Sequence, residues 1–170
     1  MSRRNYYAIH KGRVDQPTIF SSWVQVHPRV VGYNGAKHQC FDTLEDARNW
    51  VQGEGRNEFS EIVKSKLASK TSQRPRGKFY AIAYGRTTGV FEDYGEVEKA
   101  IKGFKSACYQ RFDTPEEAKE FIDQWRAAYS EVWQREIKRR LHNGWLPRDL
   151  SFNTELILET DNENAEEDSA

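Results

Sequence analysis

The chain has 170 residues, and its 26 Lys and Arg residues balance 26 Asp and Glu residues, so the formal net charge is zero. This balance argues against a strongly electrostatic nucleic-acid binder, and two cysteines are too few for a disulfide framework. No apolar run is long enough to cross a membrane, and the start of the sequence is unlike a signal peptide. We therefore expect a soluble, intracellular protein that has no membrane partner.

The zero total conceals two segments of opposite charge. Between residues 53 and 78 Lys and Arg outnumber Glu, whereas residues 151–170 contain several Asp and Glu and no basic residue. The Ser, Thr, Arg and Pro of the middle segment are typical of a linker. The acidic composition of residues 151–170 predicts a disordered tail.

One stretch of the chain occurs twice. The first copy opens with YYAIHKGR at residue 6, and the second opens with FYAIAYGR at residue 79. Further along, both copies carry the triplet Phe-Asp-Thr, at residues 41–43 and 112–114. A duplication of this length predicts two copies of one small structural unit.

Each copy has the pattern of a small antiparallel sheet. An alternating run, a Gly-Arg turn and a second short run predict a β-hairpin. The segment after the hairpin has the length for a turn or two of helix, over residues 24–31 or 95–101, although Pro28 limits the first of these to a helix start or edge. A third strand around residues 38–41 or 109–112 completes the sheet.

The clearest helix start is the run Thr114-Pro115-Glu116-Glu117, which has a capping hydroxyl, a proline at the first helical position and a Glu three residues after the cap. Residues 43–46 carry a weaker form of this signal. Apolar residues at helical spacing then predict one amphipathic helix on each sheet, in the order β-β-α-β-α. In the second copy the helical pattern continues, and its apolar stripe needs a partner surface. The stripe consists of Tyr129, Trp133, Ile137 and Leu141.

The predicted fold class is α+β, with two small β-β-α-β-α modules at residues 4–52 and 78–126. Each module is expected to be a three-stranded antiparallel sheet packed by helices. A basic linker at residues 53–77, in which we expect a short helix, joins them. A helical extension at residues 127–150 and the disordered acidic tail at residues 151–170 complete the chain. The aromatic residues assigned to the cores are Phe41, Trp50, Phe112 and Trp125.

The repeated motifs also resemble a known family. The YYAIHKGR strand, a tryptophan after a short second strand, the run GYNGAK and a T-x-E-x-A helix start are similar to the N-terminal hybrid-binding domain of the eukaryotic type-1 ribonucleases H. The same module occurs in the caulimovirus transactivator/viroplasmin protein. The resemblance covers somewhat more than half of the chain and implies recognition of RNA–DNA hybrid, or more weakly of double-stranded RNA, without sequence preference.

The resemblance implies a surface of aromatic faces, basic side chains and backbone amides near the RNA 2′-hydroxyls. The residues that it places there in the first copy are Tyr7, Arg13, Trp23, Gly35, Ala36, Lys37 and His38. Those in the second copy are Tyr80, Arg86, Tyr94, Ser106, Ala107, Tyr109, Gln110 and Arg111. From the residues alone, the aromatic side chains also fit a core role, and the two arginines fit turns.

The sequence departs from the family pattern at a basic pair. That pair falls on Gln39-Cys40 and on Gln110-Arg111, so the first copy lacks both bases and the second retains one. Since each lost phosphate contact weakens binding at every sequence, each copy alone should bind less tightly than a typical family member. Two linked copies would recover affinity by about 10²- to 10⁴-fold if both engage one ligand.

These patterns favour a non-catalytic protein that binds RNA–DNA hybrid or double-stranded RNA through two tandem modules. No residues at metal-ligand or catalytic spacing are found, and we expect no cofactor. The alternative is a protein-interaction or assembly module that has lost nucleic-acid binding, with a protein partner or a second copy of the chain docking on the helix at residues 127–141. An accessory role that delivers a separate nuclease to hybrids is compatible with either.

Overall fold

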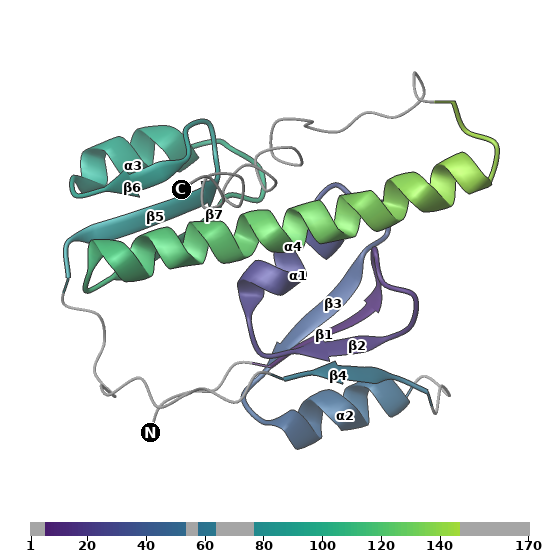
Figure 1. Ribbon diagram of the computed structural model, residues 1–170. Coiled ribbons are helices and arrows are strands. Elements are labelled where there is room, and N and C mark those ends of the chain that lie inside the picture. The colour runs from purple at the N-terminus through teal and green to yellow at the C-terminus, as the bar shows by residue number, and fades with distance from the viewer. Residues whose placement is uncertain (1–5, 54–57, 64–76, 147–170) are drawn as a thin grey trace, which may run out of the picture.

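The computed structural model of the chain describes residues 6–53, 58–63 and 77–146 (Figure 1). It contains two small sheets, and each sheet packs one helix against each of its faces. The long helix α4 (Pro115–His142) lies against the second sheet and continues past the first module (Figure 1). The predicted α+β class and its two small antiparallel-rich sheets are confirmed.

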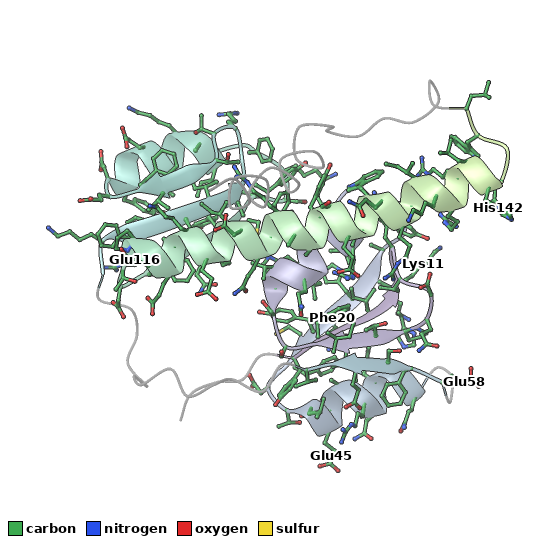
Figure 2. The ribbon with its side chains drawn as sticks, viewed as in Figure 1. Lys11, Phe20, Glu45, Glu58, Glu116 and His142 are labelled. Atoms are coloured by element: carbon green, nitrogen blue, oxygen red, sulfur yellow. The ribbon has the colours of Figure 1, made fainter. Side chains whose placement is uncertain are left out.

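The first sheet is built on a central strand paired on both sides. β1 pairs antiparallel with β2 and with β3, as predicted. Helix α1 (Trp23–Val30) covers one face above Ile9 and Phe20, and α2 (Leu44–Gln52) covers the other (Figure 2). The strands are β1 (Tyr6–Lys11), β2 (Thr18–Phe20), β3 (Lys37–Phe41) and β4 (Ser60–Ile62), in the order β3-β1-β2-β4.

The fourth strand, β4, corrects the prediction of a short helix in the linker. It pairs parallel with β2 and extends the first sheet beyond the three strands expected. Phe59 and Val63 pack against the core under α2, and Glu61 reaches Arg48 on α2 at 2.6 Å. Residues 59, 61 and 63 therefore lie on the same side of the chain, and this spacing of two residues is that of a strand and not of a helix. Residues 64–76 of the predicted linker lie outside the described residues.

Helix α1 runs through Pro28, contrary to the prediction that this residue marks a helix start or edge. The helix begins five residues earlier, at Trp23, and ends at Val30, so the proline lies near its C-terminal end. Only one intrahelical hydrogen bond is lost there. Pro28 is fully buried, so its ring contributes to packing instead.

The second sheet repeats the hairpin and third strand of the first. Its central strand pairs antiparallel on both sides, and a register shift near its end occurs at the same place as in the first sheet. Helix α3 (Tyr94–Ile101) lies against one face and α4 against the other. The strands are β5 (Phe79–Tyr84), β6 (Gly89–Phe91) and β7 (Cys108–Phe112), in the order β6-β5-β7.

Helix α4 joins the two modules through α1. Trp125 is fully buried, and Tyr129 is 7 % exposed, in a cluster that also contains Val24 of α1. Trp133 packs against the same cluster, whereas Leu141, at the far end of the predicted stripe, is 42 % exposed. The first module therefore covers much of the stripe that needed a partner surface.

Candidate nucleic-acid interface

Three residues of the first copy that the resemblance selected lie together on the α1 side of the first sheet. The register places Tyr7 opposite Cys40, so Tyr7 and His38 share one face of the sheet. The ring of Trp23, the first residue of α1, lies 5.4 Å from that of Tyr7 and 5.8 Å from that of His38. We call these three residues the first aromatic surface.

The second copy forms a similar group on the α3 side of its sheet. Tyr80 pairs with Arg111, and both lie on the same face as Tyr109. The Tyr80 ring is 5.6 Å from the ring of Tyr94 and 5.7 Å from the guanidinium carbon of Arg111. Tyr94 and Tyr109 are 52 % and 44 % exposed. These four residues form the second aromatic surface, and their exposure leaves ring faces open to a ligand.

A tight loop precedes the third strand in each module. Gly35 in the first loop has a φ of +71°, and a β-carbon built on it would lie 3.3 Å from the ammonium nitrogen of Lys11. Ala36 follows it, before β3. Lys11, at the end of β1 (Figure 2), was not among the sequence candidates. Its pairing with Lys37 brings two basic residues to this end of the sheet.

Two candidates lie away from the aromatic surfaces. The ammonium of Lys37 is 5.9 Å from the centre of the Trp50 ring, on the α2 side of the sheet. Gln110 pairs with Ala81, which belongs to the core under α4. Because side chains alternate along a strand, Gln110 lies on the face opposite Tyr109.

The two turn arginines occupy different surroundings. The backbone N–H of each arginine donates to a carbonyl near the end of the neighbouring helix. Arg13 donates to Arg29 at 2.8 Å, and Arg86 donates to Ala100 at 3.0 Å. The Arg13 side chain is half-buried, and its guanidinium carbon is 4.6 Å from the centre of the Trp133 ring on α4. Burial lowers the pKa of Arg13, opposed by the charge of Glu136. Arg86 is exposed, and its guanidinium donates to the carbonyl of Lys99 at 3.4 Å.

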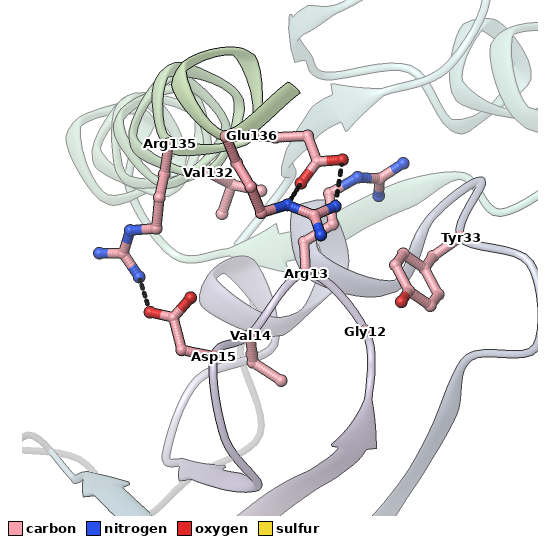
Figure 3. Close-up of a pocket in the computed structure, with 9 residues that line it drawn as sticks. Gly12, Arg13, Val14, Asp15, Tyr33, Val132, Arg135 and Glu136 are labelled. Atoms are coloured by element: carbon pink, nitrogen blue, oxygen red, sulfur yellow. Dashed lines mark hydrogen bonds and ion pairs between the residues drawn. The ribbon is translucent and has the colours of Figure 1, made fainter. Parts of the chain in front are cut away.

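A hollow of about 270 Å³ lies beside Arg13, between the β1–β2 connection and α4 (Figure 3). Two ion pairs occupy its rim: Arg135 is 3.4 Å from Asp15, and Arg139 is 2.8 Å from Glu136 (Figure 3). Both guanidinium groups are therefore already paired with carboxylates. Because the hollow is lined by the first module and by α4, we interpret it as part of the joint between the modules.

His27 of α1 binds directly to the second module. Its Nδ1 is 3.0 Å from the indole Nε1 of Trp125, and its Nε2 is 2.7 Å from the backbone carbonyl of Ser106. An indole N–H can only donate, so Nδ1 accepts and Nε2–H donates to Ser106. Burial lowers the pKa of His27, opposed by the bond to Ser106. Ser106, a candidate for contact with nucleic acid, is therefore held by the first module through its carbonyl, and Ala107 follows it.

The two cysteines should differ in reactivity. Burial raises the pKa of Cys108 to about 12. Partial burial and the charge of Asp42 also raise the pKa of Cys40, but its side chain is exposed. Since the thiolate is the reactive form, a disulfide reagent at pH 8 should label Cys40 and leave Cys108 unlabelled. Spectrophotometric thiol counting tests this, with denatured protein as the control; rapid labelling of both in the folded protein would contradict it.

Metal and membrane sites are not found in the part of the chain that the structure describes. Within residues 6–53, 58–63 and 77–146 no three His, Cys, Asp or Glu side chains are placed to hold a metal ion. Among these same elements, no helix combines the length and apolar character that crossing a membrane requires.

Comparison with known proteins identifies a family. The profile of the ribonuclease H1 N-terminal domain matches residues 5–51 and again residues 78–122. A ribonuclease H of Saccharomyces cerevisiae is 37 % identical over 49 residues, which cover 29 % of this chain and 14 % of that protein. A ribonuclease H of Schizosaccharomyces pombe is 36 % identical over 52 residues, covering 31 % of this chain and 20 % of the relative.

A third ribonuclease H, from Crithidia fasciculata, is 29 % identical over 60 residues, covering 35 % of this chain and 12 % of the relative. The chain thus spans a fifth or less of each of these three relatives. No solved structure matches. Because the family profile accounts for more than half of the residues, in two separate regions, the chain belongs to the family of the ribonuclease H1 N-terminal domain.

Proposed function

We propose that this chain is a non-catalytic protein that binds RNA–DNA hybrid, and more weakly double-stranded RNA, by shape through its two tandem modules. The observation that carries the proposal is the pair of aromatic surfaces, each built on the face of a family module that packs α1 or α3. Aromatic faces of this kind stack against sugars or bases whatever the sequence. The match to the N-terminal domain of ribonuclease H supports the same ligand class.

A non-catalytic role is supported by the part of the family that is present. The match lies in the N-terminal domain alone, and hybrid cleavage uses carboxylates that hold two metal ions. The described residues offer no such group of ligands. Binding without cleavage is therefore the activity that we assign to the chain.

The proposal is tested by titrating labelled RNA–DNA hybrid, double-stranded RNA and double-stranded DNA of one sequence at several salt concentrations. The intact chain should bind hybrid most tightly. Trp23→Ala and Tyr109→Ala should each weaken binding by about 1–3 kcal/mol, or roughly 5- to 150-fold. Fluorescence anisotropy measures the affinities, and circular dichroism checks that each variant remains folded.

Trp145→Ala is the matched control, because Trp145 is 48 % exposed beyond the end of α4 and belongs to neither aromatic surface. Its affinity for hybrid should equal that of the intact chain. Arg111→Gln should lower the salt slope by about one, as expected for one lost phosphate contact. Absence of saturable binding at low salt would reject the proposal and favour a protein-interaction role.

A further inference from the structure

The loops before β3 and β7 need the same unusual backbone conformation at one position. Gly35 and Ser106 are equivalent in the two copies, and their φ angles are +71° and +63°. Within the described residues, Ser106 is the one non-glycine residue with a positive φ. A residue with a β-carbon pays a free-energy penalty in this left-handed region, whereas glycine does not. The second loop therefore needs a compensating interaction that the first does not need.

The compensating interaction comes from the first module. The Nε2–H of His27 donates to the carbonyl of Ser106 at 2.7 Å, and these residues are 79 positions apart in the chain. His27 is 1 % exposed, and Trp125 fixes its tautomer through Nδ1. Because the buried N–H of His27 would be costly to leave without an acceptor, this bond favours the loop conformation that presents the carbonyl of Ser106 to His27.

His27 has no counterpart in the second copy. The equivalent residue of α3 is Glu98, which is exposed and lies 3.4 Å from Lys102 of its own module. The bond to the loop therefore runs in one direction, from the first module to the second. The first loop, with glycine at the left-handed position, folds without an equivalent donor.

We propose that His27 is a positioning residue for nucleic-acid binding by the second module, holding the loop Gly103–Ala107 in its binding conformation. This inference rests on the proposed function, in which the backbone amides of that loop face the RNA 2′-hydroxyls. The second module then binds hybrid well only while it is docked on the first. The first loop, with Gly35 at the left-handed position, does not depend on this contact.

A double-mutant cycle tests the inference. His27→Leu should raise hydrogen exchange of the loop amides and weaken hybrid binding, each by about tenfold, which is the effect of 1.4 kcal/mol on an equilibrium. Ser106→Gly should restore both quantities in the His27→Leu chain, because glycine adopts the left-handed conformation without help. His27→Gln, which keeps an N–H donor, should retain most of both.

Glu98→Leu is the matched control and should alter neither measurement. Exchange rates of the loop that His27→Leu leaves unchanged would overturn the inference, as would a loosened loop with undiminished hybrid affinity. If His27→Leu does not fold, His27→Met, which has the shape of the glutamine variant but no donor, replaces it in the same cycle with Ser106→Gly. Loop amides that exchange no faster in His27→Met than in His27→Gln would overturn the inference. Absence of hybrid binding by the unaltered chain would instead reject the proposed function.

Discussion

Replacing Trp125 with alanine is expected to lower the free energy of unfolding by about 3–5 kcal/mol, the usual cost of removing a large buried aromatic side chain. Trp125 is 0 % exposed, in the cluster that joins the modules. Its ring stacks between Tyr84, at 5.6 Å, and Tyr129, at 5.1 Å. The substitution leaves a cavity and also removes the donor to Nδ1 of His27.

Urea unfolding followed by circular dichroism measures this effect. Trp145→Ala provides the control, because an exposed tryptophan outside the core should change stability by no more than about 0.5 kcal/mol. The Trp125→Ala chain should also lose the coupling between modules, so that their unfolding transitions separate. A loss below 1 kcal/mol, or a single transition as steep as in the unaltered chain, would contradict this account.

Acidification is expected to loosen the contact between the modules through His27. Burial lowers the pKa of His27 below its ordinary value of 6.5, opposed by the bond to Ser106, so the unfolded chain takes up this proton at a higher pH than the folded chain. The stability that His27 contributes is therefore complete above pH 6.5 and is lost as the pH falls toward the folded-state pKa.

The hydrogen bonds of His27 also predict that its protonation destabilises the contact between the modules. A proton on Nδ1 would face the indole N–H of Trp125, and two donors cannot share a hydrogen bond. The other groups around the ring are the Ser106 carbonyl and the rings of Trp23 and Tyr84. None of these groups is a carboxylate, so none offers a negative charge to stabilise imidazolium.

Thermal unfolding between pH 7.5 and pH 5.5 checks this prediction. The melting temperature of the unaltered chain should fall across this window, and that of His27→Gln should fall less, because glutamine carries no proton there. Equal slopes for the two chains would show that His27 is not the group responsible.

Elements specified by neighbouring residues could be predicted from the sequence. The hydroxyls of Thr43 and Thr114 accept from the backbone amides of Asp46 and Glu117 at 3.1 and 3.2 Å, as the capping patterns predict. The strands of both hairpins follow in the same way from alternation and turn residues. Helix starts and hairpins depend on a few adjacent residues, so a single sequence is enough to predict them.

Strand β4 and the docking of α1 on α4 could not be predicted, because their contacts join residues far apart in the chain. β4 pairs parallel with β2, about 40 residues earlier in the chain, so no hairpin turn indicates the pairing. The stripe on α4 indicated that a partner surface exists but not that the first module supplies it. Packing between modules depends on their relative positions, which no local pattern encodes.

The candidate site was predicted only in part, because some of its residues are also placed by packing between the modules. Tyr7, Trp23 and His38 come together because strand register and the start of α1 place them on one face. The family resemblance selected Arg13 and Ser106, yet the structure places both at the joint between modules. A sequence alignment shows which positions of the two copies are equivalent. It does not show which of those positions the other module covers.

The joint between the modules also bears on symmetry. Two equivalent units contact each other through different surfaces, α1 of one and α4 of the next, and a heterologous contact of this kind can repeat without end. Divergence between the copies stops the repetition. The second copy has Glu98 where the first has His27, and helix α2 ends at Gln52, whereas α4 continues to His142. The equivalent elements of the other faces, α3 and α2, therefore lack the residues that make the contact between α1 and α4.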